Sequence, residues 1–159
     1  MRYARLQWLF PLVAALHNLE ESIWLPAWSL HAGKWYPPVE AGAFRFAAAV
    51  LTVAAVSIAI AAMRGGGQSV AAYLSFGYTI AMLANAVVPH IALSLVLRAY
   101  TPGVATALLE VPVLALLARL AVKEDYVSGS RAVEYAVGVP AVLLLSIRPL
   151  LALGSRISG

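Results

Sequence analysis

One long uncharged stretch, Val70-AAYLSFGYTIAMLANAVVPHIALSLV-Leu97, decides the fold class. A helix needs about 20 apolar residues to cross the roughly 30 Å of bilayer hydrocarbon. This stretch is long for one crossing and short for two, so it predicts one tilted or kinked helix. Pro89 marks the expected break, because proline has no N–H to donate to the carbonyl of Asn85, four residues earlier.

The composition of the whole chain leads to the same class. Of 159 residues, 62% are hydrophobic and 11% are charged, against about 25% charged in an average soluble domain. A soluble fold of this size has too little interior to hide so much apolar surface. We therefore expect a single transmembrane domain over residues 1–159, with the lipid bilayer as its surroundings.

The gaps between charged residues predict an all-α polytopic membrane helix bundle of about five transmembrane helices. Continuous apolar runs favour helices, because the strands of a membrane barrel would alternate in character over about ten residues. The interruptions at Gln7, His17 and Glu20 argue against a cleaved signal peptide in the first run. The expected spans are approximately Leu6–Leu25, Gly42–Met63, Val70–Leu97, Val104–Val122 and Ala132–Leu153.

Charge and cysteine content exclude several functions. The chain has no cysteine, which removes disulfides, thiolate metal sites, iron–sulfur clusters and cysteine nucleophiles. Its 11 basic and 7 acidic residues give a net charge of +4. These charges lie singly at the edges of apolar runs and form no basic face, so we expect no nucleic-acid partner.

Basic residues also indicate an orientation for this multi-pass protein in the cell membrane. Arg2, Arg5 and Arg64 lie near the ends of the first two expected spans, on the side of the N terminus. Cytoplasmic loops are enriched in lysine and arginine. We therefore expect the N terminus to be cytoplasmic.

The first span contains three ionisable residues, in the stretch His17-Asn-Leu-Glu20-Glu21. An ionisable group at mid-membrane costs roughly 2.5–3.5 kcal/mol on insertion scales, so each one needs a reason. Residues three and four positions apart share a helix face. An imidazole and two carboxylates on one face are typical of a divalent-metal site or of a proton-sharing cluster.

Further polar groups in later spans lie at a matching depth. Asn85 and His90 flank Pro89, and Glu110 stands among leucines and valines before Pro112. At 1.5 Å per residue, His17, His90 and Glu110 each lie roughly 9–12 Å from span ends on the same side of the membrane. We expect these groups to converge in one layer, with Arg98 and the first loop above it.

His17-x-x-Glu20-Glu21 resembles the HXXEE family, a group of integral membrane proteins named for this motif. The likeness extends to Asn85 with His90 and to the segment Ser94-Leu-Val-Leu-Arg98-Ala-Tyr100-Thr-Pro102-Gly103 with Thr106. These blocks cover roughly the first 110 residues and leave the last span unplaced. The family has no established reaction, so the resemblance supports the choice of residues and implies little about activity.

The leading functional hypothesis is an intramembrane metal centre. His17, Glu20, His90 and Glu110 are the candidate ligands, Glu21 and Arg98 the candidate catalytic residues, and Asn85 a further polar group of the site. Imidazole and carboxylate ligands suit zinc, iron or manganese. A divalent transition metal would support hydrolysis with a spare carboxylate as general base, or oxidation in the case of iron. The apolar surroundings favour a lipid-like substrate.

Other functions stay open at this stage. The polar groups would equally form a buried network that locks the helices together without chemistry. In that case the chain would be a non-catalytic accessory or assembly subunit of a larger membrane complex. Haem ligation by His17 and His90, or proton-coupled transport, are further options. The sequence does not decide whether the protein is an enzyme.

Overall fold

The computed structural model describes residues 2–158 as a bundle of helices. In chain order these are α1 (Arg2–Leu6), α2 (Leu9–Ser29), the 3-10 turn η1 (Gly33–Trp35), α3 (Ala41–Gly65), α4 (Val70–Asn85), the π-helical segment η2 (Ala86–Ile91), α5 (Ala92–Leu97), α6 (Val104–Lys123) and α7 (Gly129–Ser158). Residues 2–158 contain no strand. The predicted all-α helical bundle is confirmed.

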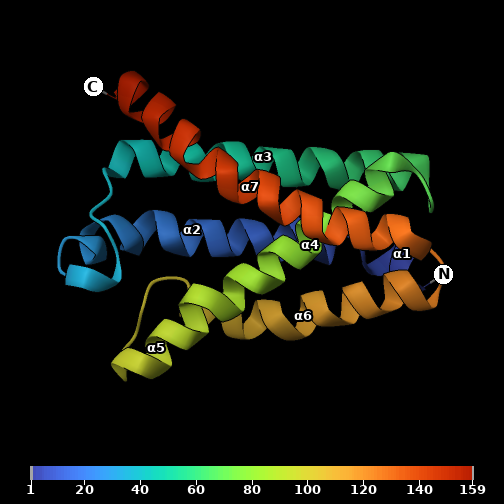
Figure 1. Ribbon diagram of the computed structural model, residues 1–159, viewed down its shortest axis with the longest axis horizontal. Coiled ribbons are helices and arrows are strands. Elements are labelled where there is room, and N and C mark those ends of the chain that lie inside the picture. Colours follow the sequence, from blue (N-terminus) through green and yellow to red (C-terminus); the bar gives the residue numbers. More distant parts are fainter. Residues whose placement is uncertain (1, 159) are drawn as a thin grey trace.

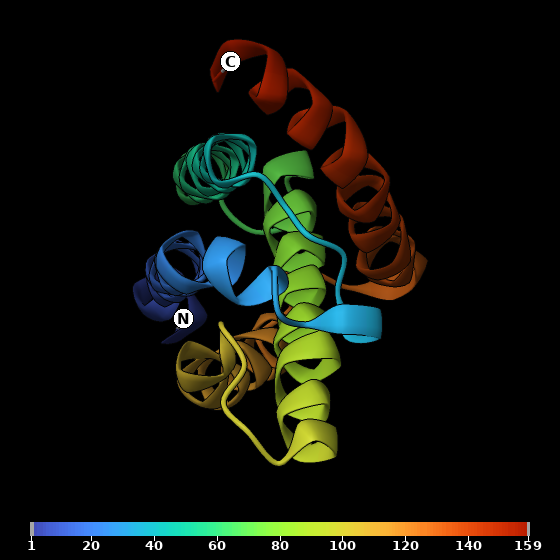
Figure 2. The same ribbon diagram turned by 90° about the vertical axis from the view of Figure 1, so that its left-hand side faces the viewer.

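Helices α2, α3 and α6 lie side by side, and α4 and α7 pack against them. Helix α2 lies between α3 and α6, while α4 crosses obliquely in front of them (Figure 1). Helix α7 packs on α3 and α4, on the far side of the bundle from α6 (Figure 2). The two ends of the chain lie at opposite ends of the bundle (Figure 1). The helix that carries the HXXEE motif is therefore flanked on both sides.

Within the described residues, four helical stretches are long and apolar enough to cross a membrane: Ala41–Gly65, Val70–Leu97, Val104–Lys123 and Gly129–Ser158. Helix α2 is 21 residues long but is not among them. Its ionisable motif lowers its hydropathy, and those side chains face neighbouring helices instead of lipid. A crossing by α2, the first of the five expected spans, therefore stays a prediction that rests on its position between two apolar helices.

Two expected spans differ in their ends from the observed helices. The first begins at Leu9, because a break after Leu6 separates it from α1. It ends at Ser29, four residues beyond the expected end. Backbone N–H groups of Arg2 and Tyr3 donate to the Glu124 carboxylate, which fixes α1 against the end of α6. The last helix, α7, extends beyond the expected Ala132–Leu153 in both directions.

The stretch from Val70 to Leu97 is one kinked helix, as predicted. Its α-helical part ends at Asn85, and the π-helical segment η2 contains Pro89 and a non-helical residue, Val88 (φ −131°, ψ 115°). Wide helical turns of this kind are frequent at functional sites. Here the kink turns His90 toward α2, where its ring stacks edge-on against that of His17 with centroids 4.6 Å apart.

Small residues bring the helices close together. The buried face of α3 consists largely of alanines, including Ala43, Ala47 and Ala48. Near the end of α7, Gly154 lies directly against Ala43; a Cβ at Gly154 would be 2.8 Å from the Ala43 Cα. Small residues allow this backbone approach between membrane helices.

Candidate metal centre

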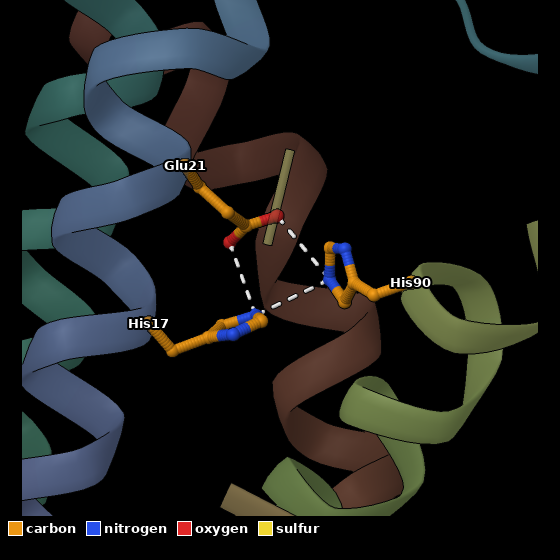
Figure 3. A group of neighbouring side chains, drawn as sticks. All are labelled: His17, Glu21 and His90. Carbon is orange, nitrogen blue, oxygen red and sulfur yellow. Dashed lines mark hydrogen bonds and ion pairs between the residues drawn. The ribbon is translucent and has the colours of Figure 1, made fainter. Parts of the chain in front are cut away.

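Three ligand-type side chains meet between α2 and η2 (Figure 3). His17 and Glu21 project from the same face of α2, one turn apart, and His90 projects from η2 toward them. The two Nε2 atoms of His17 and His90 are 3.2 Å apart. The Glu21 carboxylate lies 3.7 Å from His17 Nε2 and 3.4 Å from His90 Nε2. His17 is fully buried and His90 is 4% exposed.

The hydrogen bond of His90 Nδ1 determines which ring nitrogen carries the proton. His90 Nδ1 lies 2.8 Å from the backbone carbonyl of Pro102, which can only accept. Nδ1 must therefore carry the hydrogen and donate it to Pro102. In the neutral ring this leaves a lone pair on Nε2, directed at His17 and Glu21.

The same reasoning places the proton on the His17 ring. His17 Nδ1 lies 3.0 Å from the hydroxyl oxygen of Thr106. That hydroxyl donates its own hydrogen to the Glu20 carboxylate, so it accepts from His17. Nδ1 is thus the donor, and His17 Nε2 also presents a lone pair.

Two imidazole lone pairs and a carboxylate therefore face one another. Three acceptors in contact repel unless a proton or a cation lies among them. Tetrahedral zinc with bonds of roughly 2.0–2.1 Å separates its ligand atoms by about 3.3–3.4 Å. The two Nε2 atoms are 3.2 Å apart, and the Glu21 contacts of 3.4 and 3.7 Å use different carboxylate oxygens, Oε1 toward His90 and Oε2 toward His17. The His17, Glu21 and His90 side chains could therefore hold a metal ion.

Asn85 lies against the same two nitrogens. Its Nδ2 is 3.2 Å from His17 Nε2 and 3.2 Å from His90 Nε2. With this orientation the amide donates to the histidines; turned over, it presents Oδ1 as a fourth ligand. Asn85 is therefore the residue that distinguishes a metal site from a hydrogen-bonded network.

Glu20 points away from this group and toward the start of α6. Its carboxylate accepts hydrogen bonds from the backbone N–H groups of Gly103, Ala105 and Thr106 and from the hydroxyls of Tyr100 and Thr106. Helix α6 has no side-chain cap of its own from Gly103. A carboxylate at a helix N terminus satisfies free N–H groups and complements the helix dipole. Glu20 thus caps α6 from a different helix.

Gly103 is required where α6 begins. Its backbone is left-handed, with φ +93°. A Cβ there would lie 2.5 Å from His90 Nδ1 and 3.0 Å from His17 Cε1. The glycine therefore allows the chain to pass directly beneath both histidine rings.

Replacing Gly103 by alanine is expected to lower the free energy of unfolding by about 2 kcal/mol or more, since backbone strain adds to overpacking. The control is Gly129→Ala, because Gly129 also has a positive φ (+66°) but open space around its Cβ position. Thermal unfolding in detergent compares the two variants. Equal losses would show that the contact with the histidine rings is unimportant.

Glu110 and Arg98 occupy other places. Glu110 is completely buried, and one carboxylate oxygen lies 3.4 Å from His17 Nδ1, on the opposite side of the ring from Nε2. It therefore adjoins the site behind His17 and is not within the ligand group. Arg98 is exposed at the end of α5, and its side chain makes no ion pair or hydrogen bond in the part of the chain that the structure describes.

The structure therefore brings the predicted residues together but gives them different positions. His17, His90, Asn85 and Glu110 converge as expected. Glu21, chosen from sequence as a catalytic base, occupies the ligand position, and Glu20, chosen as a ligand, is fully engaged in capping α6. Sequence reasoning missed the supporting roles of Thr106 and the Pro102 carbonyl. Their signal was the turn Thr101-Pro-Gly103 directly before a span.

The fold and the site define a multi-helix membrane-type protein with a buried histidine–glutamate cluster. The chain belongs to the HXXEE family, described as "Protein of unknown function with HXXEE motif", which matches residues 8–117. It is also 31% identical over 150 residues to "Uncharacterized protein YrkK" of Bacillus subtilis (strain 168), covering 94% of this chain and 95% of that one. No solved structure matches the chain.

Proposed function

We propose that His17, Glu21 and His90 bind a divalent transition metal, namely zinc, iron or manganese, and that the protein is a metal-dependent membrane enzyme acting on a lipid-like substrate. The observation that carries this proposal is the convergence of two imidazole lone pairs and one carboxylate, with contacts of 3.2–3.7 Å between them. Histidine and glutamate ligands projecting from facing helices are how helix bundles build such sites.

The residues around the ligands have separate tasks in this proposal. Pro102 and Thr106 accept from the Nδ1–H groups, which orients both imidazoles and increases their basicity. Glu110 adds a carboxylate behind His17. A bound metal would act as a Lewis acid and lower the pKa of a coordinated water. If Glu21 bound the metal through one oxygen, its second oxygen would remain free to accept a proton.

The variant Asn85→Asp distinguishes a metal centre from a hydrogen-bonded network that has only a structural role. Aspartate cannot donate to the histidines, but it offers an anionic ligand. The proposal predicts that Asn85→Asp retains at least the wild-type metal content, whereas Asn85→Leu loses about tenfold in affinity. Elemental analysis of the purified proteins measures the metal content, and competition with a chelator measures the affinity. Asn18→Asp is the control, because Asn18 donates to Thr52 on α3 instead.

A hydrogen-bonded network without metal would give the opposite pattern. Asn85→Asp would then place a further acceptor among acceptors, and both Asn85 variants would unfold at lower temperature than the wild type. Lower stability of Asn85→Asp with no metal in any of the proteins would refute the metal centre.

We further propose that the end of the bundle with the N terminus faces the cytoplasm. Arg2, Arg5, Arg64, Lys123 and Arg131 all lie at this end, on α1 and on the adjoining ends of α3, α6 and α7. The candidate centre then lies nearer the outer side.

Because the chain has no cysteine, single cysteines report the orientation directly. Lys34→Cys, in the first loop, should react with a membrane-impermeant maleimide on intact cells, while Lys123→Cys should react only after lysis. The reverse labelling would place the N terminus outside.

A further inference from the structure

A cavity of about 630 Å³ adjoins the candidate centre, enclosed by α2, α3, α4 with η2, and α7. Most of its wall is aliphatic or aromatic, including Ala48, Leu51, Met82 and Leu143. Its polar lining residues are Asn18, Glu21, Tyr36, Tyr78 and Asn85, and the Tyr78 hydroxyl donates to the backbone carbonyl of Leu51. Since Glu21 and Asn85 belong to the candidate centre, the cavity and the centre share a wall.

The cavity results from the path of α7. Near the start of this helix the Tyr135 carbonyl lies so close to Gly77 of α4 that a methyl group there would overlap it. Near the end, Gly154 lies directly against Ala43 of α3. Between these two contacts, the segment from Pro140 to Leu151 lines the cavity. The space is therefore held open by close helix contacts at both of its ends.

The opening of the cavity faces the surroundings of membrane-crossing helices. Val88 and Leu144 both line it and are 65% and 70% exposed. Both residues lie within stretches that are long and apolar enough to span a membrane. A ligand entering there would come from the hydrocarbon of the bilayer.

The dimensions fit one hydrocarbon chain. From Pro140 to Leu151 the lining of α7 rises about 16 Å at 1.5 Å per residue. The volume lies within the roughly 300–1,000 Å³ typical of sites for a single small ligand. A two-chain phospholipid is several times larger than such a ligand.

The polar end of the cavity defines the ligand's head group. Glu21 is acidic, and no lysine or arginine is among the described lining residues, so in the metal-free protein an anionic head group would lack a counter-charge. Burial and the nearby Glu21 carboxylate raise the pKa of Tyr36 to about 12, which keeps its phenol protonated as a donor. A neutral head group with an oxygen acceptor suits these residues.

We propose that this cavity binds the hydrocarbon chain of a neutral single-chain lipid, such as a fatty alcohol or its ester, with the oxygen of the head group beside Glu21 and Asn85. That this oxygen is the reacting end rests on the proposed function. The binding of the chain does not, because it depends on the cavity alone.

The test is photo-crosslinking of the chelator-treated protein in lipid nanodiscs with a long-chain fatty alcohol carrying a diazirine near the end of its chain. We expect adducts on α7 between Pro140 and Leu151 and on the lining residues of α3. Adducts spread evenly over the exposed faces of the helices would overturn the proposal.

Two filling variants and one matched control sharpen the test. Ala48→Phe and Ala81→Phe place a ring in the cavity and should lower this labelling about tenfold. Ala49→Phe makes the same change at the neighbouring, exposed position of α3 and should leave it unchanged. Equal labelling of all three variants would contradict the proposal, and the adduct positions in the wild type decide the matter if a filled variant does not fold.

Competition defines the ligand class and separates this inference from the metal proposal. Unlabelled fatty alcohol should displace the probe, whereas equally strong displacement by the fatty acid or by phosphatidylcholine would refute a neutral single-chain ligand. Because the metal is removed in these measurements, cavity labelling without metal binding in the untreated protein would refute only the proposed function. Metal binding without cavity labelling would refute only this inference.

Discussion

Replacing His17 by alanine should weaken metal binding by more than a hundredfold. His17 supplies one of two imidazole nitrogens at the centre, and loss of a group that merely holds a ligand in place already costs 10–100-fold. Affinity is measured by competition with a chelator of known strength. His31→Ala is the control, because His31 is an exposed histidine in the first loop, and its metal affinity should equal that of the wild type.

The buried position of His17 requires a second variant. Alanine leaves a void in the core, so the protein loses stability whether or not a metal binds. His17→Gln fills most of the space but lacks the imidazole, and it should lose the metal to a similar degree. If His17→Gln keeps wild-type affinity, His17 is not a ligand.

Replacing Glu20 by alanine should lower the free energy of unfolding by about 3 kcal/mol or more, since it leaves several donors around a half-buried site without their charged acceptor. The control is Glu40→Ala. Glu40 is an exposed cap that accepts from Gly42 and Ala43 at the start of its own helix, α3, so its loss should lower the free energy of unfolding much less. Thermal unfolding in detergent compares the two.

The two replacements also differ in what they disturb. Glu20 joins α2 to the start of α6, whereas Glu40 serves only the helix that it precedes. A loss for Glu20→Ala no larger than that for Glu40→Ala would mean that the capping of α6 from α2 contributes little to the fold.

Much of the fold was predictable because lipid restricts the choice of structure. Charge-free runs of sufficient length can only be helices, and Pro89 fixed the position of the kink. The ends of the helices were harder to predict. Helix α2 continues to Ser29 through Pro26, although a proline commonly ends a helix. The short α1 is held by Glu124, a residue far away in the sequence.

The meeting of the polar residues was predictable from depth, whereas their individual roles were not. Glu20 and Glu21 are adjacent, and successive helix residues point about 100° apart. Which of them faces α6 and which faces η2 depends on the neighbouring helices. The turn Thr101-Pro-Gly103 indicated that the chain bends before α6, but not that the Pro102 carbonyl and the Thr106 hydroxyl accept from the two histidine rings.

The most direct test of the central claim is elemental analysis of wild-type protein purified without chelator, after growth with zinc, iron or manganese supplied separately. A buried site with two neutral imidazoles and a carboxylate should retain about one divalent ion per chain for at least one of these metals. The His17→Gln protein, prepared in parallel, should retain almost none. Trace metal in the wild type under all three conditions, or equal metal in the two proteins, would contradict the claim that His17, Glu21 and His90 form a metal centre.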